Sequence, residues 1–262
     1  MRLALSSAAA PDATFDELLA ACARRGFAAV ELEVGHAHGV SPSAGPAAAL
    51  SAAVRATNAG IGIAALRLDD LAAVADPGTP RLAVALGAPV VVRIDAEATV
   101  FDGKAEGSDG DVASIIRAAA PRFAETGATL LLACRGDAAE IERLRLLAEA
   151  APPGTVGLAW DVAPDDPGLK VPGAVLAAAD DRIRHIRLYG GGPEAIGQEG
   201  IGVGRLMSAL ALSGYSGALA LAPSDRRYRY AWGAWLGRRG GWGCGSKAGS
   251  DMVVLESEVE KG

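Results

Sequence analysis

The sequence predicts a (β/α)8 TIM barrel, a single α/β domain that ends in an irregular C-terminal tail. A short β-branched or leucine-rich run followed by a longer Ala/Leu/Arg segment with helical spacing recurs along the chain, with Gly or Pro between units. The short runs are apolar on both faces, which is typical of parallel strands covered by helices. Eight such units in roughly 225 residues match the length and order of a parallel barrel.

The strands and helices are expected to alternate in chain order. The expected strands cover 2–7, 28–34, 62–68, 89–95, 129–135, 156–162, 183–190 and 217–223. The expected helices cover 14–26, 45–60, 79–87, 108–127, 137–151, 168–180 and 204–214. Thr14 and Glu17 are spaced as a capping box, Gly26 closes that first helix, and Pro121 predicts a kink in the fourth helix.

Two further points concern the fold. An open doubly wound sheet is the alternative, but it usually has fewer strands and opens with a dinucleotide-binding glycine pattern that "LALSSAAAP" lacks. Residues 1–224 are expected to form the barrel, and 225–262 form an Arg/Trp/Gly-rich tail in which Ser250 could cap a short final helix. Trp232, Trp235 and Trp242 could cover the barrel rim or make a subunit contact in a homodimer, and a loosely ordered tail is equally compatible.

Composition excludes several classes of protein. The net charge of -6 disfavours a nucleic-acid partner, which normally requires a basic surface. No apolar run is long enough for a membrane span, and acidic residues interrupt the N-terminus too early for a signal peptide, so we expect a cytoplasmic protein. The three cysteines are far apart and fit neither a disulfide framework nor a zinc motif.

Polar side chains gather at the expected carboxyl ends of the strands, where barrels of this kind carry their chemistry. Alternate residues of a strand face the same way, so these groups should meet at one mouth. They are Glu31, Glu33, His36, His38, Arg67, Asp69, Arg93, Asp95, Asp161, His185, Arg187 and Tyr189. Buried ions cost several kcal/mol each unless paired, so the groups either form a salt-bridged rim or bind a polar ligand. The glycine-rich segment 190–204 before the last expected helix could seat a phosphate, or could be a simple turn.

Several segments resemble the xylose-isomerase-like barrels, the sugar phosphate isomerase/epimerase superfamily. The segments are "RLALSS", "GFAAVELE", "GLAWDV", "RIRHIRLYG" and "GQEGIGVGRLMSALALSGYSGALAL". The resemblance implies proton transfer between adjacent sugar carbons and a divalent ion (Mn, Mg or Zn) held by Glu, Asp, His and Glu on strands five to eight. Only Asp161 fits these ligand positions, because the others fall on Ala133 or Cys134, on Arg187 and on Ala222, and a histidine often found nearby is Pro164. A guanidinium only donates hydrogen bonds, so the usual metal site is not expected to form.

Two functions follow as expectations. The first is an isomerase or epimerase acting on a small sugar, sugar phosphate or polyol, with four candidate acid–base groups: Glu31, Glu33, His36 and His185. Its candidate binding groups are Arg67, Arg93, Asp161, Arg187, Tyr189 and Glu199. The second is a catalytically silent barrel that binds a metabolite, peptide or partner protein without a metal. A related family of abasic-site endonucleases needs many metal ligands and a basic surface, which three histidines and the acidic charge disfavour.

Overall fold

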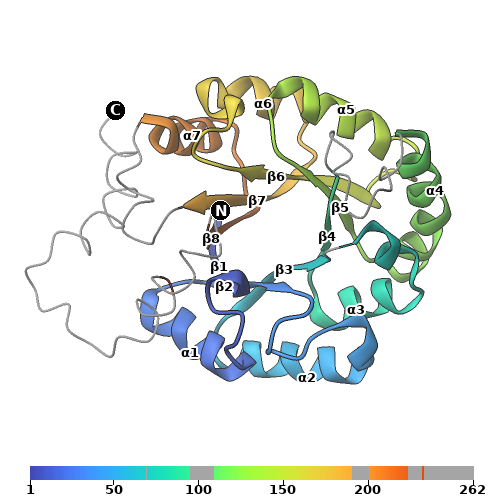
Figure 1. Ribbon diagram of the computed structural model, residues 1–262, viewed down its shortest axis with the longest axis vertical. Coiled ribbons are helices and arrows are strands. Elements are labelled where there is room, and N and C mark those ends of the chain that lie inside the picture. The colour runs from blue at the N-terminus through green and yellow to red at the C-terminus, as the bar shows by residue number, and fades with distance from the viewer. Residues whose placement is uncertain (69, 95–108, 191–200, 224–231, 233–262) are drawn as a thin grey trace, which may run out of the picture.

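The chain forms a closed barrel of eight parallel strands with helices around the outside (Figure 1). The computed structural model describes residues 1–68, 70–94, 109–190, 201–223 and 232. Each strand pairs with the next in the chain, and the eighth pairs with the first, which confirms the predicted fold and excludes an open sheet. The strands are β1 (Arg2–Ser6), β2 (Ala29–Glu33), β3 (Gly62–Leu68), β4 (Val90–Arg93), β5 (Leu130–Cys134), β6 (Val156–Val162), β7 (Ile183–Gly190) and β8 (Ala218–Pro223).

Seven helices of the described residues cover the barrel. They are α1 (Phe15–Arg25), α2 (Gly45–Asn58), α3 (Gly78–Leu86), α4 (Asp109–Thr126), α5 (Ala138–Ala148), α6 (Pro172–Ala178) and α7 (Ile201–Leu212). The capping box of Thr14 and Glu17 is present, and Gly26 ends α1 in the left-handed conformation. α4 continues through Pro121, so this proline does not end the helix. None of these helices combines the length and hydrophobicity that a membrane span needs.

One expected helix is wrong in its extent. The segment 168–180 is divided into a 3-10 turn, η4 (Pro167–Lys170), and α6. Val171 separates the two with a non-helical backbone (φ -141°, ψ 64°), because the ring of the following Pro172 disfavours the α conformation of the residue before it. The rest of the predicted elements differ from the observed ones only by a few residues at their ends.

The interior of the barrel is lined largely by alanine. One interior cluster contains Ala4, Ala29, Ala64, Ala218 and Ala220, and a second contains Ala65, Val91, Leu131, Ala133 and Ala159. Larger apolar side chains face outward and pack against the helices. Small interior residues leave room on the barrel axis for long polar side chains from the same strands, and close packing requires that this room be filled.

Two irregularities in the strands turn polar side chains inward. Between β6 and β7 the register shifts so that Arg184 is an extra residue between Ile183 and His185. Ile183 and Ile186 both belong to the outer core, and Arg184 is exposed, so His185 takes the interior position. β3 shifts against β2 in the same way at Ala64. Such β-bulges re-aim the side chains that follow them.

Some sequence predictions concern residues outside the described part of the chain. These are Asp69, Asp95, Glu199, segment 191–200 and nearly all of the tail, including its expected final helix. Trp232 is the one described residue of the tail, and its side chain is fully buried in the outer apolar core.

Candidate functional site

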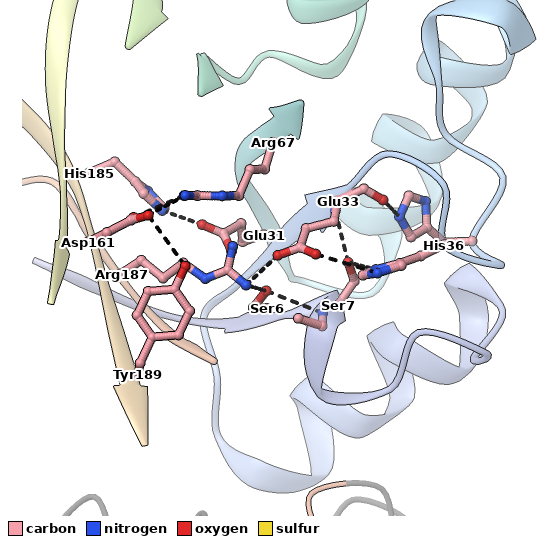
Figure 2. A network of polar contacts seen from close by, with 12 residues as sticks. Ser6, Ser7, Glu31, Glu33, His36, Arg67, Asp161, His185, Arg187 and Tyr189 are labelled. Carbon is pink, nitrogen blue, oxygen red and sulfur yellow. Dashed lines mark hydrogen bonds and ion pairs between the residues drawn. The ribbon is translucent and has the colours of Figure 1, made fainter. Parts of the chain in front are cut away.

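A network of polar contacts involving twelve residues lies at the carboxyl-terminal mouth of the barrel, and Figure 2 labels ten of them. These ten come from β1, β2, β3, β6 and β7 and from the segments directly after β1 and β2. They are Ser6, Ser7, Glu31, Glu33, His36, Arg67, Asp161, His185, Arg187 and Tyr189. Charged groups that lie far apart in the sequence therefore meet on the barrel axis, as the strand-end rule predicts.

Asp161 is the centre of one half of the network. Arg67 binds both of its carboxylate oxygens through two guanidinium nitrogens, with Nη1 lying 3.0 Å from Oδ1. The Tyr189 hydroxyl donates to Asp161 Oδ2 over 3.3 Å. Asp161 is fully buried and Arg67 nearly so. Both oxygens of this carboxylate are thus already occupied by cationic or hydroxyl donors.

Arg187 is the centre of the other half. Its Nη1 lies 3.3 Å from Glu31 Oε1, and its Nη2 contacts Glu33 Oε1 and donates to Ser6 Oγ over 3.2 Å. Only 3% of Arg187 is exposed. This guanidinium therefore bridges the two glutamates of β2, and its single positive charge partly compensates both.

His185 and Glu31 form a pair below the mouth. His185 Nε2 lies 2.6 Å from Glu31 Oε2, and both side chains are fully buried. Burial raises the pKa of Glu31, but Arg187, His185 and Arg67 outweigh it and hold that pKa well below its usual range. Glu31 is thus an anion that supports the network and has no exposed surface through which to meet a ligand.

Glu33 is held at every one of its polar atoms. Its amide N–H donates to Ser7 Oγ over 2.9 Å, and its carbonyl accepts from His38 Nε2 over 2.7 Å. Its carboxylate contacts Arg187 through Oε1 and lies 3.4 Å from His36 Nε2 through Oε2. The side chains of Glu33 and His36 nevertheless keep 13% of their surface exposed. Glu33 is therefore a fixed carboxylate that still reaches solvent.

The hydrogen bonds also define the tautomers of the two imidazoles beside Glu33. The Val40 N–H donates to His38 Nδ1, so His38 carries its proton on Nε2, and burial lowers the pKa of His38. Ser7 Oγ accepts from the Glu33 N–H, so its own proton is available for His36 Nδ1, 2.9 Å away. The proton of neutral His36 then lies on Nε2, facing the Glu33 carboxylate.

The donor set does not fit a divalent ion at the position that the family resemblance implies. Ala133 lines the barrel, Cys134 packs in the outer core, and Ala222 is fully buried at the level of Tyr189. The single matching ligand, Asp161, is bound by Arg67 and Tyr189, and Arg187 supplies a cation in place of a ligand. Within the described residues no group of three or more His, Cys, Asp or Glu side chains could hold a metal. The positive charge at this site therefore comes from the guanidinium groups of Arg67 and Arg187.

The structure brings together most of the predicted candidates. Arg93 ends β4 with an exposed side chain, and Glu199 lies outside the described residues. His38 fixes the backbone of Glu33 and is not itself at the surface. Sequence reasoning assigned no role to Ser6 and Ser7, although their place directly after the first expected strand was the signal for them.

These features define a class, the single-domain (β/α)8 barrels with a charged carboxyl-terminal mouth. No protein-family model matches the chain, and no curated protein matches it in sequence. Its structure is similar to that of L-ribulose 3-epimerase, with 15% identity, 99% of this chain and 97% of that chain covered, and a TM-score of 0.68. D-psicose 3-epimerase has 14% identity and a TM-score of 0.66, with 99% of this chain and 97% of that chain covered. A probable 3-DHS dehydratase of Bacillus anthracis has 12% identity and a TM-score of 0.64, with 90% of this chain and 97% of that chain covered. The chain thus has the fold of the xylose-isomerase-like barrels, as its sequence segments predict.

Proposed function

We propose that this protein binds a small sugar or polyol at the barrel mouth and transfers a proton between neighbouring carbons of that ligand, with Glu33 as the acid–base group. The observation that carries this proposal is the fixed and partly exposed Glu33 carboxylate. A base that removes a proton from carbon must be held in place before the ligand arrives, because positioning supplies much of the rate enhancement. Several structural neighbours act on ketoses, which supports a sugar as the ligand.

Each neighbour of Glu33 has a part in this chemistry. The carboxylate takes the proton from the hydroxyl-bearing carbon beside the ligand carbonyl and returns it to the former carbonyl carbon, while the hydroxyl proton passes to the carbonyl oxygen. One base at carbon therefore suffices for isomerisation. His36 Nε2–H faces Oε2 and donates toward the carboxylate when it is an anion. Arg187 contacts Oε1 and holds the carboxylate in position. Glu31 and His185 are fully buried and act through Arg187 and not on the ligand.

Solvent exchange tests this proposal without requiring that the product be known. The protein is incubated in D2O with D-fructose, D-psicose, D-tagatose, L-ribulose, D-xylose and D-fructose 6-phosphate, and deuterium incorporation at carbon is followed by proton NMR. We expect incorporation into at least one sugar and a loss of at least a hundredfold in Glu33→Gln, typical of removing a general base. Glu142→Gln, at a partly exposed glutamate paired with Arg145 on α5, is the matched control and should exchange at the wild-type rate. Exchange that survives in Glu33→Gln, or none with any sugar, would overturn the proposal.

A specific observation favours a second candidate, a barrel that binds a ligand without catalysis. Asp161 is saturated by Arg67 and Tyr189, and Arg187 lies where the family resemblance implies a metal ligand, as in a site that has lost its chemistry. In that case a sugar should raise the melting temperature without any exchange at carbon. A ligand at 100 times its dissociation constant stabilises the fold by about 2.7 kcal/mol, which a melting curve detects readily.

A further inference from the structure

Arg135 differs from Arg67 and Arg187, the arginines of the network at the mouth, because it forms no ion pair with a carboxylate of the described residues. It directly follows β5, and its parity is that of Leu131 and Ala133, which line the barrel. Its guanidinium carbon lies 4.8 Å from the centre of the Tyr189 ring, and Arg187 lies 4.9 Å from the same ring. The ring is therefore flanked by two guanidinium groups, one belonging to the buried network and one exposed.

The two guanidinium groups differ in their counter-charges. Arg187 contacts both Glu31 and Glu33. Arg135 makes no ion pair within 4 Å in the described part of the chain, and its contact there is the face of Tyr189. A cation on an aromatic ring keeps its N–H edge free, because the ring takes the face and leaves the in-plane donors unpaired. Within the described residues, that edge meets no carboxylate.

Asp166 is an acidic group near enough to Arg135 for the arginine charge to lower its pKa, but its two carboxylate oxygens are engaged elsewhere. Its Oδ1 accepts from the Gly168 N–H over 2.8 Å and its Oδ2 accepts from the Gly136 N–H over 3.1 Å. Burial raises the pKa of Asp166, and these two hydrogen bonds and the charge of Arg135 act against that rise. Asp166 thus fixes the backbone next to Arg135, and among the described residues it makes no ion pair with that guanidinium.

The backbone that carries Arg135 is short and fixed. Three residues, 135–137, join β5 to α5, and the Asp137 side chain caps the helix at Ala139 and Glu140. Gly136 has a φ of +127°, where side chains are rarely found, and a Cβ there would lie 3.1 Å from the Cβ of Glu140. The backbone of the linker is therefore held next to Arg135, and the contact with Tyr189 orients the guanidinium itself. Preorganised groups of this kind are what ligand sites require.

We propose that Arg135, stacked on Tyr189, binds an anionic group of the ligand, so that the site takes a sugar acid or a sugar phosphate in preference to a neutral sugar. Guanidinium groups pair bidentately with carboxylate and with phosphate, which are the two sources of this one chemistry. The inference rests on the proposed function for the sugar part of the ligand, but binding of the anion does not require turnover. It places the anionic group at the end of β5, across the mouth from Glu33 on β2.

Binding measured by isothermal titration calorimetry tests the inference with D-fructose, D-fructose 6-phosphate, D-gluconate and inorganic phosphate. We expect at least one of the two anionic sugars to bind tenfold or more tightly than fructose, and Arg135→Ala to abolish that advantage while Arg135→Lys keeps part of it. Raising the salt concentration should weaken the anionic ligands and not fructose. The matched control is Arg81→Ala, an exposed arginine on α3, which should bind all four ligands as the wild type does.

Variants of the ring and of the base separate the parts of the inference. Tyr189→Phe keeps the stacking surface and should keep the preference for the anion, whereas Tyr189→Leu should lose most of it. Glu33→Gln should still bind the anionic sugar, so a failure of the proposed catalysis leaves this test intact. The inference is overturned if fructose binds as tightly as both anionic sugars. It is equally overturned if Arg135→Ala retains the preference for the anion, or if inorganic phosphate binds as well as the sugar phosphate and independently of Arg135.

Discussion

Replacing Arg187 by alanine should lower the free energy of unfolding, because the change leaves two carboxylates without their shared cation. Glu31 is fully buried and Glu33 is 13% exposed, so the side chain that is removed compensates one buried and one largely buried charge. Removing one partner of a buried ion pair costs about 3–5 kcal/mol, which corresponds to a fall in melting temperature of roughly 10 °C in a domain of this size. Urea unfolding at pH 7.5, followed by circular dichroism, measures the change.

The pH dependence of this loss gives a second and sharper test. In the wild type the folded pKa of Glu31 lies below its unfolded value of 4.5, so this group stabilises the fold above about pH 4.5 and loses that effect as the pH falls. Without Arg187, burial should dominate and raise the folded pKa of Glu31. The variant should then gain stability relative to the wild type as the pH falls. The difference in free energy of unfolding between the two proteins should therefore shrink between pH 7.5 and pH 5.

Two controls distinguish the ion network from simple loss of volume. Arg145→Ala removes a partly exposed arginine at the protein surface that pairs with Glu142 and Glu149, and surface pairs of this kind contribute only about 0–1 kcal/mol. Combining Arg187→Met with Glu31→Gln removes charge from both partners, and should recover at least about 1 kcal/mol of the loss. A loss below about 0.5 kcal/mol in Arg187→Ala, or one that stays constant with pH, would refute the idea that Arg187 compensates the two glutamates.

Two other predictions follow from hydrogen bonds and burial. Ser7→Ala removes the hydroxyl that donates to His36 Nδ1, so nitrogen NMR should show His36 changing from a single Nε2–H tautomer to a mixture, and an unchanged spectrum would exclude the assigned tautomer. Burial raises the pKa of Cys22 to about 12 and also raises that of Cys134, so a Cys244→Ser protein should not react with a disulfide reagent at pH 8 until urea unfolds it.

The fold could be predicted from the sequence because each strand and helix is locally consistent with it. Doubly apolar runs such as "GLAWDV" of β6 are typical of parallel strands covered by helices, and helix ends such as Gly26 carry their own signals. The division of 168–180 was missed, although Pro172 marked it. Local rules fix where elements lie, and the closure of the barrel then follows from their number and order.

The sequence could predict which residues gather at the mouth, but not which of them form ion pairs with one another. Counting alternate residues placed Glu31, Glu33 and Arg187 on the same mouth, and the structure joins them through one guanidinium. The pairing of Arg67 with Asp161 spans 94 positions of the chain, and no local pattern encodes which cation meets which carboxylate. The β-bulges could not be predicted from the alternation of side chains along one strand either. An inserted residue is recognised only from the register with the neighbouring strand.

The small interior residues explain why the charged network and the fold depend on each other. A barrel axis lined by alanines such as Ala4, Ala159 and Ala220 would be hollow, and close packing does not tolerate a void of that size. Arg67 and Arg187 are the long side chains that reach into this space, and they enter it only because carboxylates from other strands accompany them. A smaller residue at either position would open the interior and also leave a carboxylate bare. The charges at the mouth are therefore part of the core of the barrel, and only the groups at their edge, such as Glu33, keep contact with solvent.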